Sequence, residues 1–288
     1  MDYYRCENPD CGFLAGEEPD ICPRCGGTFF TPLLEEDLSG GDWVWLGNQA
    51  VDEKRDTDAL ACYQRAAALG DDAGLTNLGW CLEAGIGVSA DPKQAVVLYA
   101  QAAALYRRAA EQGDAAGQCN LGYLYEAGRG VSQDWAQAAQ WYEKAAEQGY
   151  PRAMCNLGVC FEFGNGVTKD TGRAVELYRK AAERGDQTAA CNLGYLYETG
   201  VGVGQDWAQA AKWYAVSAEK GLARAQYHLA WCCEHGKGVP RDAEKALRLY
   251  QAAAEQQYED AEQRASRLLR GREKGGLFRG IFGGRKDR

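Results

Sequence analysis

Three features are missing from this sequence, and each absence excludes a class of protein. The 288 residues contain no apolar run of 18 residues, so no transmembrane helix is expected. The N-terminal MDYYRCENPD lacks the basic and apolar regions of a secretory leader, which predicts a cytoplasmic location. Only two histidines occur, and no acid–base constellation emerges around them, which favours a protein that is not an enzyme.

Positive charge is scarce outside the C-terminus. The formal net charge is −9, yet the segment from Arg270 to Arg288 holds seven lysines and arginines against two acids. The rest of the chain is therefore strongly acidic. Because binding to phosphates requires cations, we expect no nucleic-acid partner.

Disulfide bonds are not expected either, although there are twelve cysteines. Disulfides persist in oxidising compartments, and the predicted location is a reducing one. Eight cysteines lie in the repetitive part of the chain, where Cys119, Cys155 and Cys191 occupy the same repeat position. Equivalent positions in stacked helices lie about 9–10 Å apart, beyond the reach of a disulfide. We therefore expect reduced, semi-buried thiols.

An Asn-Leu-Gly tripeptide recurs along most of the chain. It begins at Asn120 and returns at Asn156 and Asn192, 36 residues apart, followed by His-Leu-Ala at His228. An earlier copy begins at Asn77, 43 residues upstream, which is seven more than the period. A fixed period in this range is typical of a solenoid, in which each unit stacks on its neighbours to bury its apolar side.

Each unit is predicted to form two helices, which we name helix A and helix B. In the unit Asp114 to Gly149, helix A ends before a Gly-x-Gly-Val loop, and helix B begins behind Asp134. Aspartate is a favoured N-cap, and glycine suits the left-handed position that ends a helix. The seven extra residues lie in helix B of the second unit, so that helix should be longer by about 10 Å.

These motifs, with the Ala-Ala and Tyr-x-Lys-Ala-Ala pattern of helix B, resemble the Sel1-like repeats, which are relatives of the tetratricopeptide repeats. The resemblance covers roughly residues 41–257. It implies an all-α fold, a right-handed α/α solenoid, and a role as an adaptor in protein complexes. It does not imply one particular partner.

The motifs also predict the division of the chain. We expect a metal-binding ribbon at 1–32, a linker at 33–41, a solenoid at 42–270 and a basic, glycine-rich tail at 271–288. Within the solenoid we expect a degenerate first unit at 42–70, full units at 71–113, 114–149, 150–185, 186–221 and 222–257, and a capping helix at 258–270.

The N-terminal ribbon carries four cysteines in two pairs. Four residues separate Cys6 from Cys11, and two separate Cys22 from Cys25. Two such turns can close a tetrahedral four-sulfur site, and a segment with so few apolar residues needs one to fold. The run CGF…GEEPDICPRCG resembles the rubredoxin-like and zinc-ribbon group, although the wider first pair departs from its pattern. We expect structural zinc; iron, a redox pair and free thiols are the alternatives.

The predicted binding surface is a concave face formed by helix A. By resemblance to tetratricopeptide repeats, this face comes from positions −1, 0, +3 and +6, counted from the Asn of each unit. Its predicted residues are Asn77, Trp80, Glu83, Asn120, Tyr123, Glu126, Asn156, Glu162, Asn192, Tyr195, Glu198, His228, Trp231 and Glu234. Asparagine amides can pair with a peptide backbone, and a row of glutamates would select basic or polar segments. The alternative is that the asparagines cap helix carbonyls and the glutamates are solvated.

The tail admits several hypotheses. Its Leu277-Phe278 and Ile281-Phe282 pairs lie among glycines and arginines. It is a solubilising end, a short motif that docks into a protein groove or onto an anionic membrane, or a segment that docks on the acidic face of its own chain.

Three patterns suggest enzymes or a second metal site, and each has a simpler explanation. Ser217-x-x-Lys220 matches a β-lactamase motif in letters but lies within helix B, and the glycines after Gly200 follow no strand. His228, Cys232 and His235 share a helix face but also fill repeat positions. We therefore expect a non-enzymatic scaffold that binds a protein or peptide. The alternatives are an electron-transfer protein with an iron-loaded ribbon and a β-lactamase-like or cell-wall-active Sel1 protein.

Overall fold

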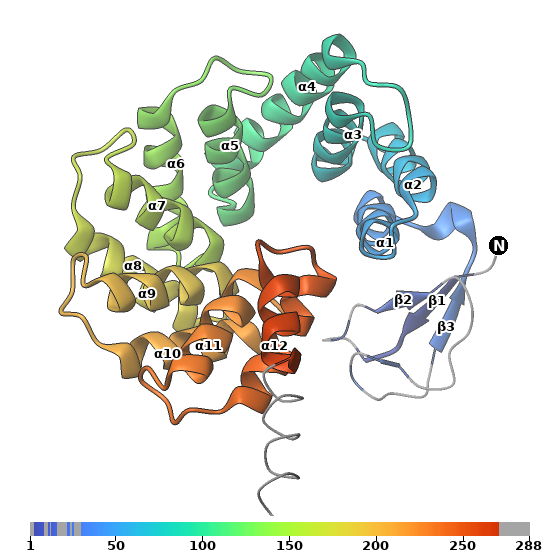
Figure 1. Cartoon of the computed structure of the whole chain (residues 1–288). Helices are drawn as coiled ribbons and strands as arrows, with labels where there is room; N and C mark the ends of the chain where they lie inside the picture. Colours follow the sequence, from blue (N-terminus) through green and yellow to red (C-terminus); the bar gives the residue numbers. More distant parts are fainter. Residues whose placement is uncertain are drawn as a thin grey trace, which may run out of the picture. The chain divides into compact units, whose positions relative to one another are not determined.

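The computed structural model describes residues 3–8, 11, 13–15, 22, 23, 25 and 30–270. The basic tail, with the docking hypotheses attached to it, lies outside the described residues. The chain divides into two compact units, Met1–Asp134 and Trp135–Arg288, each of which is described by itself (Figure 1).

The first unit begins with a small antiparallel sheet. Strand β1 (Tyr3–Cys6) lies between β2 (Leu14–Ala15) and β3 (Phe30–Leu33). In the register, Tyr4 faces Ala15 on one side and Pro32 on the other. Proline suits β3 because an edge strand leaves one row of amides outside the ladder.

This sheet packs directly on the first helix pair, α1 (Gly40–Asp52) and α2 (Asp56–Ala68). Tyr3 meets Trp43 edge-on at 5.7 Å between ring centroids, and Phe13 meets Trp45 at 5.6 Å. Leu14 is 2% exposed and belongs to the same apolar cluster as Trp43. The segment predicted as a linker holds a 3-10 turn, η1 (Glu35–Asp37), followed by the buried Leu38.

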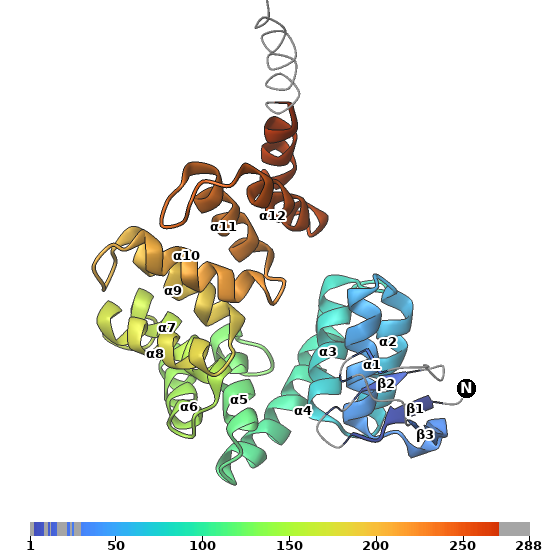
Figure 2. The same cartoon turned by 90° about the horizontal axis from the view of Figure 1, so that it is seen from below.

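Within the described residues, helices and their connecting loops make up the remainder of both units. The first unit continues with α3 (Asp72–Ala84), α4 (Pro92–Glu111) and α5 (Ala115–Ala127). The second contains α6 (Trp135–Glu147), α7 (Pro151–Phe163), α8 (Thr171–Glu183), α9 (Gln187–Thr199), α10 (Trp207–Ala218), α11 (Ala223–His235) and α12 (Ala243–Glu255), and residues 261–270 are also helical. Pairs such as α7 and α8 pack side by side and follow one another along the chain (Figure 2). The predicted all-α solenoid of tandem helix pairs is confirmed. Within the described residues, no helix has the length and apolarity needed to cross a membrane.

The predicted caps define the helix ends. Aspartate side chains accept backbone N–H bonds at most helix starts, for example Asp170 from Arg173 at 2.9 Å. Each helix A that precedes a Gly-x-Gly loop ends on a glycine in the left-handed conformation, such as Gly200 with φ +76°. A side chain is strained at such a φ, so the sequence pattern and the backbone agree.

A buried tyrosine in helix B locks each pair together. The residue is at most 2% exposed in six repeats: Tyr63, Tyr99, Tyr142, Tyr178, Tyr214 and Tyr250. The ring lies against the glycine at position +2 of helix A. A Cβ added to Gly158 would lie only 2.7 Å from the Tyr178 ring, which explains the small residue of the tripeptide.

Helix α4 has 20 residues against 13 in α6, α8 and α12, so the predicted extension is confirmed. It also moves the position where the next repeat packs. The second loop glycine, such as Gly202, normally lies against the first residue of the preceding helix B, here Thr171. On α4, Gly130 lies instead against Tyr99, seven residues beyond the first.

The displacement leaves the first turns of α4 uncovered. Val96 is 57% exposed. Its equivalents in the other repeats are all buried: Leu60, Ala139, Val175, Ala211 and Leu247. Ala103, one heptad further along α4, is 2% exposed and takes the buried position instead.

Candidate functional site

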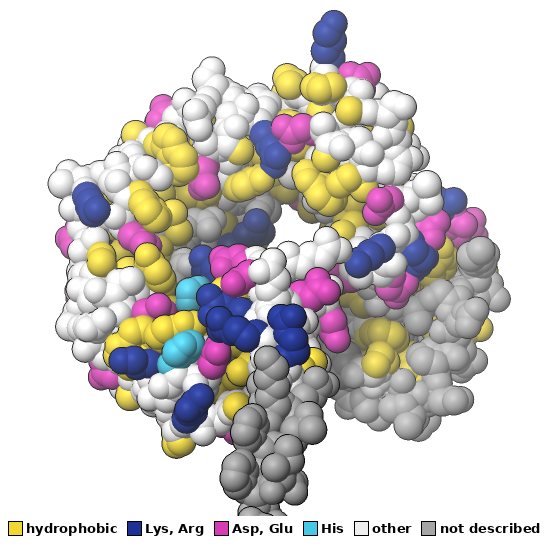
Figure 3. All heavy atoms as spheres, viewed as in Figure 1, with side chains coloured by type: hydrophobic (Ala, Val, Ile, Leu, Met, Phe, Trp, Pro, Cys, Tyr) yellow, Lys and Arg dark blue, Asp and Glu magenta, His cyan; other side chains and the backbone are white. Residues whose placement is uncertain are grey.

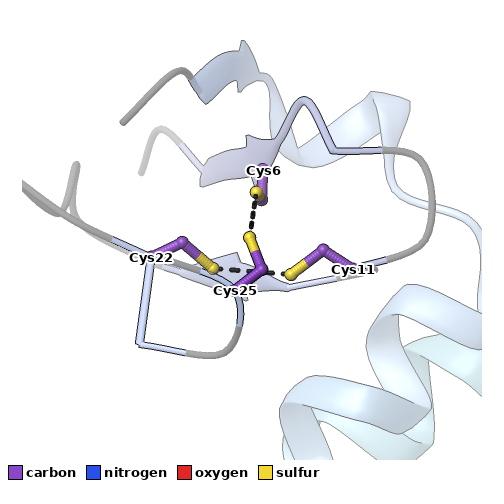
Figure 4. A group of neighbouring side chains, drawn as sticks. All are labelled: Cys6, Cys11, Cys22 and Cys25. Atoms are coloured by element: carbon purple, nitrogen blue, oxygen red, sulfur yellow. Dashed lines mark hydrogen bonds between the residues drawn. The ribbon is translucent and has the colours of Figure 1, made fainter. Parts of the chain in front are cut away.

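The four cysteines of the ribbon converge on one point (Figure 4). Their sulfur atoms all lie within 4.8 Å of one another, with Cys6 and Cys25 3.5 Å apart and Cys11 and Cys22 3.4 Å apart. The first pair is held by a tight turn, because the Cys11 amide donates to the carbonyl of Asn8 at 3.0 Å. Three of the thiols are buried and Cys25 is exposed.

This arrangement fits a tetrahedral metal ion. A zinc ion with Zn–S bonds of about 2.3 Å separates its sulfur ligands by about 3.8 Å. The two separations of 3.5 and 3.4 Å lie just below that value, all four sulfurs lie within 4.8 Å, and among the described residues Phe13 and Phe30 pack on the three buried cysteines. The four cysteines could therefore hold zinc or iron, since both accept four thiolates.

The helix A face shows a second pattern, in which the glutamate at +6 accepts a hydrogen bond from the buried tyrosine of its own repeat. The distances from the hydroxyl to the carboxylate are 2.9 Å for Tyr99–Glu83, 2.7 Å for Tyr178–Glu162, 2.5 Å for Tyr214–Glu198 and 3.0 Å for Tyr250–Glu234. In the degenerate first unit, Tyr63 donates to Asn48 at 2.8 Å instead. The glutamates thus have a structural role that the sequence analysis did not assign.

Burial keeps these tyrosines protonated. Desolvation is the main cause that raises the pKa of Tyr178, and the charge of Glu162 is the next. Desolvation is also the main cause that raises the pKa of Tyr63 to about 12. Burial also acts to raise the pKa of Glu198, but hydrogen bonds from His228 and Tyr214 outweigh it and lower the pKa overall. The protonated hydroxyls therefore donate to the carboxylates, as Tyr214 does to Glu198.

Three of the glutamates also have a basic side chain as a neighbour. Arg129 reaches Glu83 at 2.7 Å, Arg267 reaches Glu234 at 3.1 Å, and the Nδ1 atom of His228 lies 3.4 Å from Glu198. Glu126 also interacts with neighbouring groups of the chain. The expected continuous acidic strip is therefore interrupted, because these carboxylates are balanced locally.

For Glu162, the described residues supply only the Tyr178 hydroxyl and no cation within ion-pair distance. It lines a pocket of about 410 Å³ in the second unit. The pocket is formed by helix A side chains of three successive repeats and one tyrosine of helix B: Val159, Glu162, Phe163, Tyr178, Thr188, Asn192, Tyr195, Arg224 and His228.

Four of the predicted face residues line this pocket, namely Glu162, Asn192, Tyr195 and His228, and the others do not. The position-zero residues of all five units are half-buried: Asn77, Asn120, Asn156, Asn192 and His228. Tyr123 lies beside Arg129, and Trp80 packs against the α1–α2 cluster. Trp231 stacks between Trp207, at 5.3 Å, and His235, at 4.4 Å. Figure 3 shows both histidines at the surface beside basic side chains.

Three residues of this face were missed by the sequence analysis. Arg224, at position −4, donates to Asn192 and to Cys191, so a cation is present where none was expected. Phe163, at +7, is 63% exposed in the pocket. Arg129 comes from the variable loop position. Phe163 and Arg129 each occur in a single unit, and arginine stands at −4 in only two units, as Arg152 and Arg224, so periodicity carried little signal for them.

The patterns that suggested enzymes have structural explanations. Ser217 is fully buried and donates to the Gln187 carbonyl at 2.8 Å, and Lys220 donates to the Gly185 carbonyl at 2.7 Å. Ser217 therefore satisfies a carbonyl group of its own repeat, and Lys220 satisfies one of the preceding repeat. Within the described residues, the four ribbon cysteines are the one group that gathers metal-ligating atoms.

Comparisons with known proteins agree with the helical pattern. The model of the Sel1 repeat family matches residues 47–71, 73–105, 99–114, 115–150, 151–186, 187–222 and 223–258. The two overlapping matches fall on α4, where the extra heptad lies. Among curated proteins, no sequence matches this chain.

Several solved structures are similar. A protective antigen of uropathogenic Escherichia coli, c5321, with an SLR fold, is 34% identical over 84% of this chain, with a TM-score of 0.56. The match spans 50% of the antigen, so the chain corresponds to about half its length. A Sel1 repeat protein from Oxalobacter formigenes is also 34% identical, over 74% of this chain and 84% of its own, with a TM-score of 0.49.

The immunity protein Pa5087 from Pseudomonas aeruginosa is similar in fold, with 21% identity, coverage of 78% of this chain and 83% of its own, and a TM-score of 0.52. The family matches cover most of the chain, and they coincide with the paired helices, the Gly-x-Gly loops and the buried tyrosines. The chain belongs to the Sel1 repeat family.

Proposed function

We propose that this protein is a non-enzymatic scaffold that binds a polypeptide segment on its helix A face. Sel1 repeat proteins generally mediate protein–protein interactions. The observation that carries the proposal is the pocket around Glu162, because five of its nine lining residues stand at positions that the sequence analysis assigned to the binding face. Residues at +3, +6 and zero of successive repeats, among them Glu162, Asn192 and Tyr195, line one depression.

The pocket has the chemistry of a peptide site. Its volume of about 410 Å³ suits one or two side chains of a ligand. Tyr195 is 47% exposed and offers a rigid apolar surface, while Thr188, Asn192 and Glu162 offer polar groups of both kinds. An extended segment can therefore place apolar and polar groups in it alternately.

A photo-crosslinking residue at position 195 tests this proposal. The control carries the same crosslinking residue in place of Glu176, which is exposed on α8, the helix B of the fourth unit. We expect crosslinked protein partners from position 195 and not from position 176 when the full chain is expressed in its host. Equal capture at both positions, or none at 195, would show that this face is not the binding surface.

We further propose that the ribbon holds a structural zinc ion and secures the N-terminal end of the solenoid. The four sulfurs are close enough for one ion, and the sheet that they hold together packs on Trp43 and Trp45 of α1. Arg5 of β1 also pairs with Asp42 at 2.7 Å. Zinc binding would therefore stabilise the α1–α2 pair as well as the ribbon.

Metal analysis of the purified full chain separates the alternatives. We expect about one zinc per chain and a colourless protein. A coloured, iron-containing protein would favour electron transfer. Removing the metal with a chelator should increase hydrogen exchange in α1 and α2 but leave α8 to α12 unchanged. Unchanged exchange in α1 would show that the ribbon is not a structural cap.

A further inference from the structure

The glutamates at +6 differ in what balances their charge, and the difference identifies one of them as a ligand site. Glu83 and Glu234 each pair with an arginine of the chain, and Glu198 lies beside His228. For Glu162, the described residues provide a tyrosine hydroxyl but no cation. A half-buried carboxylate gains most from a cation that brings its own hydrogen bonds.

The protein itself shows which cation such a site takes. Arg129 donates to Glu83 and to the Tyr123 hydroxyl, and its guanidinium lies 5.2 Å from the ring centroid of Tyr99 and 5.7 Å from that of Tyr123. A guanidinium is therefore held by one carboxylate and two tyrosine rings. Planar guanidinium groups suit this setting because they pair with carboxylates and stack on aromatic faces.

The Glu162 pocket contains the same kinds of side chain without an arginine at the loop position. Glu162 corresponds to Glu83 by repeat position, Tyr178 to Tyr99, and Tyr195 to Tyr123. The loop position of Arg129 is occupied by Val201, which is 42% exposed and carries no charge. The two sites share their residue types. Their repeats are offset differently, because the extension of α4 displaces the next repeat along that helix.

The basic side chains that line the pocket already have partners. Arg224 donates to Asn192 and, at 3.1 Å, to the sulfur of Cys191. His228 lies against Glu198 and stacks on Tyr214 at 4.9 Å between ring centroids. Within the described residues neither forms an ion pair with Glu162. An incoming cation therefore has a carboxylate available to it.

We infer that the Glu162 pocket binds an arginine side chain of the partner segment. The guanidinium pairs with the Glu162 carboxylate and stacks on the exposed rings of Phe163 and Tyr195. This inference rests on the proposed function, and it specifies the chemistry of the ligand at one position of the face.

Titration of the full chain with small probes tests the inference. The probes are acetyl-arginine amide and acetyl-citrulline amide, which share a shape but not a charge, and binding is followed by backbone amide NMR. We expect the arginine probe to shift resonances of α7 and α9 and to bind at least about tenfold more tightly than the citrulline probe. Equal binding of the two probes, or equal binding of α-acetyl-lysine amide, would overturn the assignment.

Two variants locate the interaction. Glu162→Gln should weaken the arginine probe by about tenfold, to the level of citrulline. Glu83→Gln should not change it, because Arg129 already occupies that carboxylate. Amide spectra outside α7 and α9 that match the wild type show that the variants are folded. If Glu162→Gln leaves binding unchanged, the inference is wrong.

The crosslinking experiment separates the two proposals. If position 195 captures a partner but arginine is not recognised, the scaffold function stands and the arginine pocket is wrong. If position 195 captures nothing, the scaffold function fails as well.

Discussion

A series of three glycines in one loop tests whether the contact between repeats controls stability. Gly200, Gly202 and Gly204 lie within five residues, after α9, but meet different constraints. Gly200 has φ +76°, and a Cβ there would lie 3.2 Å from the Cβ atom of Gln205, a tight contact that a shift of a few tenths of an ångström relieves. Gly202 has φ +71°, and a Cβ there would lie 2.6 Å from the backbone oxygen of Thr171. A Cβ on Gly204 would meet nothing within 4 Å.

The expected losses follow from these constraints. Alanine in the left-handed region costs about 1–2 kcal/mol, which is the whole effect expected for Gly200→Ala. Gly202→Ala adds the displacement of a neighbouring backbone, about 1–3 kcal/mol, for a total of roughly 2–5 kcal/mol. Gly204→Ala should stabilise by about 0.4–1 kcal/mol, because alanine lowers the entropy of the unfolded chain.

Chemical unfolding followed by far-ultraviolet circular dichroism gives the order of stability. Repeat arrays open unit by unit, so hydrogen exchange is needed to locate the change. For Gly202→Ala we expect faster exchange in α8 and α9, the helices joined by this contact. If Gly202→Ala and Gly200→Ala are equally stable, the contact with Thr171 contributes nothing and our account of repeat stacking is wrong.

Three further predictions concern the buried columns. Tyr214→Phe removes a donor to a carboxylate and should lower the free energy of unfolding by about 1.5–3 kcal/mol. Tyr63→Phe removes a donor to the neutral Asn48 and should lower it by only about 0.5–1.5 kcal/mol, so equal losses in denaturant titrations would contradict this. Because the folded pKa of Glu198 is lowered, the contribution of this carboxylate to the free energy of unfolding is complete above its unfolded pKa of about 4.3 and is lost as the pH falls through the folded value. The stability difference between wild type and Glu198→Gln should therefore vanish in acid, and a constant difference from pH 7 to pH 3 would exclude this linkage. Val96→Ser should change the melting temperature little, whereas Val175→Ser, at the equivalent buried position, should lower it clearly, and similar shifts would argue against the displacement along α4.

Much of the fold was predictable because it repeats. The Asn-Leu-Gly spacing located helix A, and the loop glycines located the helix ends. The length of α4 followed from seven extra residues that kept the helical phase. The consequence of that extension was not predictable, because Val96 becomes exposed only when the next repeat moves along α4.

The binding face was harder to predict than the fold. Its residues were selected by analogy, and the pattern showed a column of glutamates without showing what each one contacts. The hydrogen bond from Tyr178 to Glu162 connects residues 16 apart on two helices, and Arg129 reaches Glu83 from the following repeat. Such contacts depend on how repeats stack, which periodicity alone does not specify.

The glutamate column therefore serves the fold and the surface at once. One carboxylate oxygen of Glu162 accepts from the buried tyrosine, which is a requirement of the helix pair and explains why the residue repeats. Whether the remaining charge reaches a ligand depends on neighbours that do not repeat, such as Arg129 in one unit and Val201 in another. Selection for folding would keep the column uniform, while binding specificity would reside in the variable loop and end positions beside it. On this basis, exchanging residues at 163, 195 and 201 should alter which segment is bound without altering the fold.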